Sequence, residues 1–254
     1  MGTIADKLDY LNDTKDAIKT AIENKGVTVG ANDTFRSYAN KINNIQIGSS
    51  NVLNTISART SSSTPSDFAN YIRKIPKDVV VSGTDLSYTF MGCTGLVEVE
   101  EFDTSSVTKF GSLFNGCTSL TYVPSLNTSN VTAFNGTFRD CTALTTILEL
   151  DFSSATNILT MIYGSTTSLT TLGGFTNLGQ AYLTTQSANY NFYTLDLSAN
   201  TSITHDSLMN VINKLYDIAT KGVATQSLTL GNTNLAKLTS AEIQIATNKG
   251  WSVS

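Results

Sequence analysis

The sequence predicts an α+β repeat protein, in which a small helical module precedes a solenoid of stacked coils. Three observations support this prediction. An apolar motif recurs every 24 residues in the middle of the chain, longer strand-and-helix units follow it, and a helical apolar stripe lies near the N-terminus. We therefore expect residues 1–77 to form a helical attachment or oligomerisation module and residues 78–254 to form the solenoid.

Composition narrows the classes of function. The 254 residues include 16 Lys and Arg against 20 Asp and Glu, so the net charge is −4 and there is no basic surplus for binding a phosphate backbone. Hydrophobic residues make up 40% of the chain, which favours a folded protein over a disordered one. No window approaches the roughly 18 apolar residues of a membrane span, and the N-terminal residues do not resemble a secretory signal. Nucleic-acid binding and membrane insertion are not expected.

The 24-residue motif repeats Phe, Cys and Leu at constant positions, which predicts three apolar columns. A unit of this length cannot bury its own apolar face, but parallel stacking places each apolar residue beside its copy in the next coil. We expect the resulting ladders to form the core, with each cysteine acting as a small apolar residue. The ladder residues are Cys93, Cys117, Cys141, Phe90, Phe114, Phe138, Leu96, Leu120 and Leu144.

The repeated motif also carries a family resemblance. Phe-x-x-Cys-x-x-Leu-x-x-Val, joined to Thr-Ser-Asn-Val-Thr, resembles the BspA-type leucine-rich repeat family of bacterial surface proteins and phage virion proteins. The resemblance covers about residues 80–254 and implies a leucine-rich-repeat solenoid. The family often has Met where this chain has Phe110 and Phe134, a change that nearly conserves volume and leaves the predicted fold intact.

Longer strand-and-helix coils are predicted near the C-terminus. Two alternating strands, around Leu195 and Leu228, are 33 residues apart. Thr204 is a candidate N-cap for a helix that runs toward Gly222, and Thr239 begins a capping box for the next helix. We expect residues 251–253 to form a closing strand.

The N-terminal region follows a different pattern. Apolar residues at helical spacing predict an amphipathic helix of about five turns ended by Lys25-Gly26, with a short second helix at 33–42 and a fainter copy of it at 68–75. The run from Leu8 to Ile42 resembles a module at the start of tail, baseplate and fibre proteins in phages of gut bacteria. The stripe of the first helix consists of Ile4, Leu8, Leu11, Ile18 and Ile22.

Catalytic chemistry finds little support in the sequence. The single histidine, His205, lies at the start of a predicted helix, where a polar residue is common, and all three cysteines face inward. Glu98 and Glu100 would lie about 7 Å apart on one strand face, a spacing compatible with a glycosidase pair or a calcium site. We interpret them as a solvated edge, because the next repeat has no matching carboxylates. No enzyme activity, cofactor or metal is expected.

The outward positions of the repeat strands form the candidate binding surface. Hydroxyl groups and one aromatic ring suit adaptable hydrogen bonding with a sugar or a protein edge, although the same residues could serve solubility alone. The candidate binding residues are Glu98, Glu100, Thr121, Tyr122, Thr145, Thr146, Thr170 and Thr171.

These features lead to a functional expectation. The favoured hypothesis is that the chain is a structural protein of a phage virion, assembled in the host cytoplasm. Residues 1–77 would contact other virion proteins or further copies of the chain. The repeats would bind a host-surface glycan or protein, or a neighbouring virion protein. The alternative is a bacterial cell-surface adhesin of the same repeat family, and a carbohydrate-cleaving enzyme is a third, weaker hypothesis.

Overall fold

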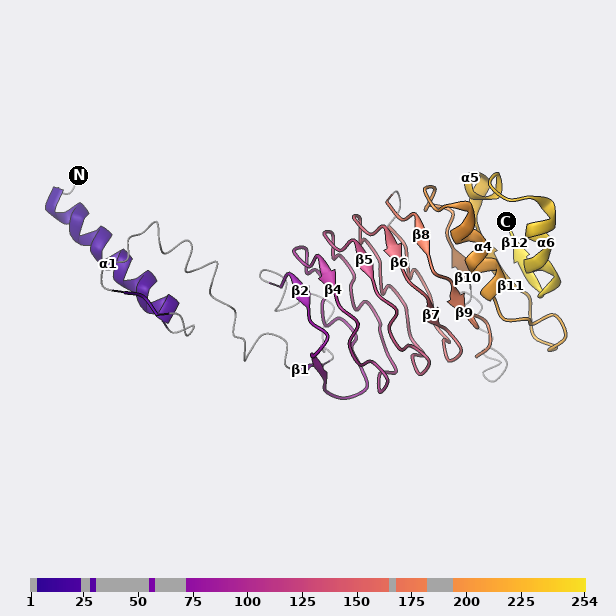
Figure 1. Cartoon of the computed structure of the whole chain (residues 1–254), viewed down its shortest axis with the longest axis horizontal. Coiled ribbons are helices and arrows are strands. Elements are labelled where there is room, and N and C mark those ends of the chain that lie inside the picture. Colours follow the sequence, from indigo (N-terminus) through magenta and orange to yellow (C-terminus); the bar gives the residue numbers. More distant parts are fainter. Residues whose placement is uncertain (1–3, 24–27, 31–54, 58–71, 165–167, 182–193) are drawn as a thin grey trace. The chain divides into compact units, whose positions relative to one another are not determined.

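The structure is a computed structural model that describes residues 4–23, 28–30, 55–57, 72–164, 168–181 and 194–254 (Figure 1). The chain divides into two compact units, Met1–Asn54 and Thr55–Ser254. The sequence placed this boundary between residues 77 and 78. The boundary falls earlier because β1 (Thr55–Ile56) and β2 (Lys74–Ile75) pair with strands of the second unit.

The first unit contains the predicted long helix, α1 (Ile4–Glu23). Ile22 and Val29 are buried against each other and Ile18 packs on them, whereas Leu8 and Leu11 are 57% and 52% exposed. The predicted helix end at 25–26 and the second helix at 33–42 lie outside the described residues.

The fainter helical copy is only partly described. Phe68 and Tyr71 lie outside the described residues, and Ile75 belongs to strand β2 rather than to a helix. Ile75 is fully buried, because β2 provides the first inward position of the strand ladder that continues at Val99.

The middle of the second unit is a stack of parallel coils with two-residue strands. Lys74 pairs with Glu98 and Tyr122 with Thr146, each 24 residues apart, so the sequence period is also the spatial register. Figure 1 shows β2, β4, β5, β6 and β8 following one another along one face. The strands are β3 (Val80–Val81), β4 (Glu98–Val99), β5 (Tyr122–Val123), β6 (Thr146–Ile147), β7 (Leu150–Asp151), β8 (Thr171–Leu172) and β9 (Phe175–Thr176).

The predicted ladder residues form the core of this coil stack, and none of the nine is more than 1% exposed. The rings of Phe90 and Phe138 stack on either side of Phe114, with centroids 5.9 and 6.0 Å away. A second aromatic column begins with Phe110 and Phe134, whose rings meet edge to face. These contacts align each coil with the next.

The cysteine column is buried, as predicted, and its three thiols are not joined in disulfides. The Cys117 thiol donates to the Phe90 carbonyl at 3.2 Å, and the Cys141 thiol donates to the Phe114 carbonyl at 3.1 Å. Burial raises the pKa of Cys141 to about 12 and also raises the pKa of Cys117. Both thiols are therefore protonated at neutral pH.

Native protein should consequently resist thiol reagents. The thiolate is the reactive species, and Cys117 lacks both access and a low pKa. We expect a colourimetric disulfide reagent to label the cysteines only after denaturant unfolds the coils. Stoichiometric labelling of native protein within minutes would contradict the inward register.

The C-terminal part adds a further parallel sheet in the order β10 (Thr194–Asp196), β11 (Gln226–Thr229), β12 (Trp251–Val253). Leu195 pairs with Leu228, which confirms the predicted 33-residue offset, and β12 is the expected closing strand.

Three helices accompany this sheet, α4 (His205–Lys214), α5 (Gly231–Leu235) and α6 (Ser240–Asn248). Thr204 caps α4 by accepting from the Ser207 N–H, and Thr239 forms the predicted capping box with Glu242. The helix α4 ends at Lys214, before the predicted stop at Gly222. No helix in the described part of the chain is long and apolar enough to cross a membrane.

Candidate binding site

Most of the predicted binding residues lie on two adjacent columns of the coil stack. The pairing of Tyr122 with Thr146, and of Thr146 with Thr171, places these three in one outward row, preceded by Glu98. Thr121, Thr145 and Thr170 precede them in the chain and form the neighbouring column. Tyr122 contributes the aromatic surface and is 40% exposed.

The threonine hydroxyls partly serve the stack itself. Thr145 Oγ1 donates to the Thr121 carbonyl at 2.9 Å, and Thr170 Oγ1 donates to the Thr145 carbonyl at 3.2 Å. A second threonine column links coils in the same way. The Thr108 hydroxyl donates to the Thr84 carbonyl, and the Thr132 hydroxyl donates to the Thr108 carbonyl. Thr145 and Thr170 thus use their protons to link coils and offer only acceptor lone pairs to a ligand.

Glu98 and Glu100 share a cation. Lys74 Nζ lies 3.0 Å from Glu98 and 2.6 Å from Glu100, and the Lys77 N–H donates to Glu100 at 2.9 Å. The Lys74 ammonium lowers the pKa of Glu100, and Glu100 in turn raises the pKa of Lys74. A general acid needs a raised pKa, so this arrangement suits an ion-paired edge better than a glycosidase pair.

A groove of about 740 Å³ opens beside these carboxylates. We call it the Tyr122 groove, and sequence reasoning did not predict it. Its walls come mainly from the coils that contain β4 and β5, and Lys77 is added from the coil that contains β2. The lining includes Lys77, Glu98, Val99, Glu100, Glu101, Asp103, Tyr122, Pro124 and Asn127.

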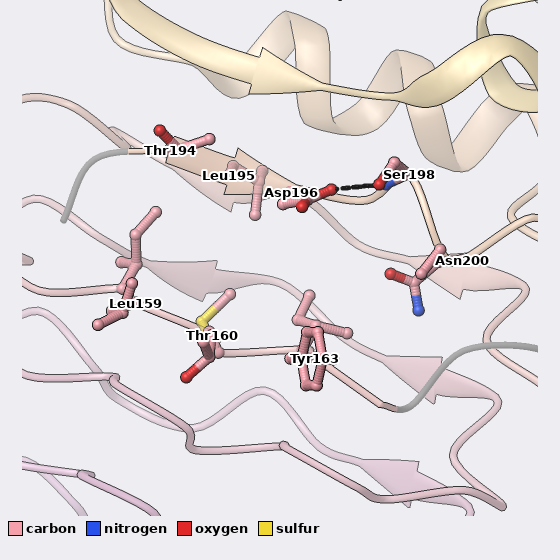
Figure 2. A pocket seen from close by; sticks show the side chains of 12 residues that line it. Leu159, Thr160, Tyr163, Thr194, Leu195, Asp196, Ser198 and Asn200 are labelled. Atoms are coloured by element: carbon pink, nitrogen blue, oxygen red, sulfur yellow. Dashed lines mark hydrogen bonds between the residues drawn. The ribbon is translucent and has the colours of Figure 1, made fainter. Parts of the chain in front are cut away.

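A second pocket, of about 270 Å³, lies between residues 158–163 and residues 194–200 (Figure 2). The Arg139 guanidinium lies 5.4 Å from the ring centre of Tyr163 in its wall. The Asp196 carboxylate in the opposite wall accepts from the Ser198 N–H at 2.9 Å and from the Ser198 hydroxyl at 2.6 Å. This carboxylate is therefore already engaged, and the lining supplies mainly hydrocarbon surface.

One family model matches the chain. Residues 84–194, which include most of the coil stack, match the family described as "Mycoplasma protein of unknown function, DUF285". Neither the curated proteins nor the solved structures include a significant match to the chain. The family description names no activity, so function has to be argued from the surface.

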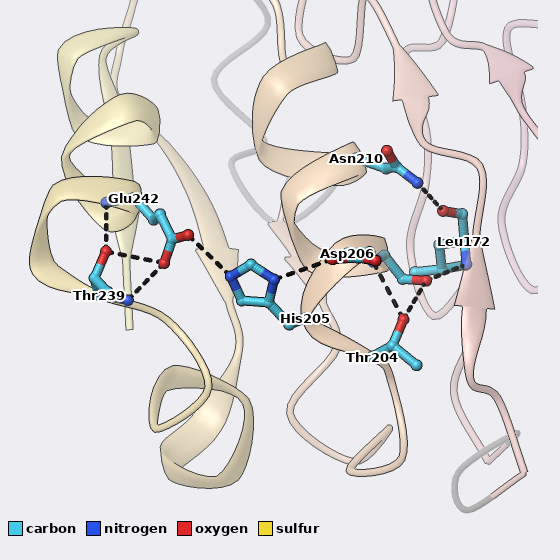
Figure 3. Close-up of polar contacts among 8 residues, drawn as sticks. Leu172, Thr204, His205, Asp206, Asn210, Thr239 and Glu242 are labelled. Atoms are coloured by element: carbon cyan, nitrogen blue, oxygen red, sulfur yellow. Dashed lines mark hydrogen bonds and ion pairs between the residues drawn. The ribbon is translucent and has the colours of Figure 1, made fainter.

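His205 is the first residue of α4, as predicted, and it also links two helices (Figure 3). Its Nε2 lies 2.9 Å from Glu242 Oε1 on α6, and its Nδ1 lies 3.2 Å from Asp206. The hydrogen bond to Asp206 raises the pKa of His205 most, and the hydrogen bond to Glu242 raises it further.

The described residues contain no group of three or more His, Cys, Asp or Glu side chains that could hold a metal ion.

The His205 contact predicts a pH-dependent contribution to stability. Because the pKa is raised on folding, the contribution is complete below the ordinary value of 6.5 and disappears as the pH rises through the folded value. We expect wild-type to exceed His205→Gln in urea stability at about pH 5.5 and to approach it at about pH 8.5. The effect should be small, because the side chain is 46% exposed. A stability difference that does not change with pH would contradict this role.

Proposed function

We propose that the coil stack and the C-terminal strand-helix units form a leucine-rich-repeat solenoid of the BspA type, and that the chain is a non-enzymatic binding component of a phage virion. The observation that carries the proposal is the outward row from Glu98 to Thr171. This row stands on a core of fully buried columns, which holds its side chains in fixed positions. Repeat proteins use such continuous faces to bind partners.

The N-terminal unit supports a division of roles. Leu8 and Leu11 leave an apolar stripe of α1 exposed, although a soluble helix normally buries such a stripe. We assign this unit to contacts with other virion proteins or with further copies of the chain. The repeat unit then takes a host-surface ligand or a neighbouring virion protein, in a tail fibre, a baseplate or a head fibre.

A bacterial cell-surface adhesin is the second candidate. The observation in its favour is the family match over residues 84–194, since the description of that family refers to proteins of a bacterium. Both candidates assign binding to the repeat unit. They differ in where the protein is located.

Electron microscopy distinguishes the two locations. An antibody raised against the full chain would be applied, with a gold label, to purified phage particles and to intact, uninfected bacteria of the same strain. Label at one structural position on the particles is the expected result and would also separate tail from head. Label on the outer surface of uninfected cells would favour the adhesin, and absence of label from both would overturn both candidates.

A further inference from the structure

The row of strands β2, β4, β5, β6 and β8 is interrupted at one position in the coil stack. Its strands form two separate sheets, β2–β4 and β5–β6–β8, with no ladder between β4 and β5. At equivalent positions of the other coils, a backbone N–H donates to the preceding coil. These bonds run from Glu100 to Ile75 at 2.9 Å, from Leu148 to Val123 at 3.0 Å and from Gly173 to Ile147 at 2.9 Å.

Proline explains the interruption. The residue at this position in the β5 coil is Pro124, which has no N–H and cannot donate to the Val99 carbonyl. The neighbouring bond, from the Thr121 N–H to the Val97 carbonyl, is also absent among the described residues. The Val99 carbonyl therefore has no backbone partner from the β5 coil, which leaves it to pair with solvent or with a ligand.

The interruption coincides with the Tyr122 groove, because Val99 and Pro124 both line it. The groove therefore offers a backbone acceptor, the Val99 carbonyl, whose equivalents the other coils use internally. The exposed Glu101 carboxylate in the lining adds a further acceptor. Asn127 Oδ1 accepts from Ser129, which leaves the Asn127 amide N–H groups to donate.

We propose that the Tyr122 groove binds a neutral, hydroxyl-rich saccharide. This inference rests on the proposed binding function and specifies its ligand class. Sugar hydroxyls both donate and accept, so they can pair with the Val99 carbonyl, the Glu101 carboxylate and the Asn127 amide together. The exposed Tyr122 ring supplies a flat surface for the C–H face of a pyranose.

Size favours a short oligosaccharide, and two lysines offset part of the negative charge of the groove. Lys74 already neutralises part of the charge of Glu98 and Glu100, and the Lys77 side chain contributes a further positive charge to the lining. These two ammonium groups offset two of the four carboxylates in the lining, Glu98, Glu100, Glu101 and Asp103, so a net negative charge remains and pentalysine is the competing ligand to test. The volume of about 740 Å³ lies within the range of small-molecule sites and suits a short oligosaccharide.

The test measures binding of the full-length chain to maltotriose, cellotriose, mannotriose and triacetylchitotriose, with pentalysine as the cationic probe. At least one saccharide should bind, and Tyr122→Ala should weaken that binding about tenfold or more, whereas Tyr122→Phe should retain it. Tyr163→Ala is the matched control, because Tyr163 is also an exposed tyrosine but lies outside the outward row and does not line the groove. Binding of pentalysine and of no saccharide would overturn the proposal.

A second variant tests the interruption itself. Pro124→Ala restores an N–H at the position where the other coils form a ladder bond, so it should close the ladder onto Val99 and weaken saccharide binding. Wild-type affinity in a Pro124→Ala protein whose Val99 carbonyl is shown by structure determination to be paired would overturn the assignment.

Binding of the same proteins to intact host cells separates the two levels of inference. Cell binding that Tyr122→Ala does not reduce would overturn the saccharide groove and leave the proposed function standing. Failure of every full-length protein to bind cells or neighbouring virion proteins would overturn the proposed function, whatever the saccharide result.

Discussion

Replacing Leu120 with Ala should lower the free energy of unfolding by about 2–5 kcal/mol. Leu120 is fully buried in the coil stack, between the copies of its column at Leu96 and Leu144. Truncation removes apolar contacts and leaves a cavity that the neighbouring coils cannot easily fill, because backbone hydrogen bonds hold this coil to both neighbours, from the Gly92 N–H to the Asn115 carbonyl and from the Gly116 N–H to the Arg139 carbonyl. Chemical denaturation of the full chain, followed by circular dichroism, measures the change.

The adjacent Thr121 provides the matched control. Its side chain points outward and is exposed, so Thr121→Ala should change the free energy of unfolding by about 0.5 kcal/mol or less. Comparing these two adjacent positions thus tests which residues of the motif face inward and which face outward. Equal destabilisation by the two variants would show that the register is wrong.

Much of the coil stack could be predicted because its period is also its register. A residue in a buried column has to match the volume of its copies in the coils before and after it, which preserves Phe, Cys and Leu at 24-residue intervals. The N-terminal ends of α4 and α6 were predicted for a local reason. Thr204 and Thr239 each satisfy backbone N–H groups within three residues, so their role needs no knowledge of the tertiary structure.

The start of the second unit could not be predicted in the same way. The strands β1 and β2 have two residues each, which is too short for an alternating pattern, and they precede the conserved spacing of the motif. Ile75 consequently resembled the third apolar position of a helix. Its strand assignment depends on pairing with Val99, a contact that only the folded chain reveals.

The candidate site shows a similar division. The 24-residue interval between Lys74 and Glu98 would have identified their ion pair, had the repeat been extended one coil toward the N-terminus. Pro124 is likewise evident in the sequence, but its effect depends on its place in the coil. That place is equivalent to the place of Leu148 in the next coil, where the Leu148 N–H donates to the Val123 carbonyl. The contact between His205 and Glu242 joins residues 37 apart on two helices, and no periodic pattern relates them.

The C-terminal units also held a residue that the sequence reasoning passed over. Asn234 is fully buried, although it is a polar residue outside the predicted strands and helices. Its amide donates to the Leu197 carbonyl at 3.0 Å and to the Asn200 carbonyl at 3.3 Å. Asn234 lies on α5, which begins at Gly231, and its contacts join residues 34 to 37 positions apart, which no spacing in the sequence reveals.

Removal of residues 1–54 should abolish self-association or incorporation into the particle and leave the remainder folded. The stripe of α1 exposes Leu8 and Leu11, and an isolated helix of this length is marginally stable in water without a packing partner. The second unit has its own buried columns and needs no contact with that stripe to close its core. Sedimentation of the full and truncated chains measures the loss of self-association.

The truncation has to begin at residue 55 rather than at 80. A chain of residues 80–254 lacks β1 and β2, so it leaves β3 and β4 without their ladder partners and should unfold more readily than residues 55–254. A full-length Leu8→Ser/Leu11→Ser variant separates the role of the stripe from that of the rest of the unit. If this variant or the truncated chain still assembles like wild-type, the contacts between copies lie on the repeats, and α1 has been assigned the wrong role.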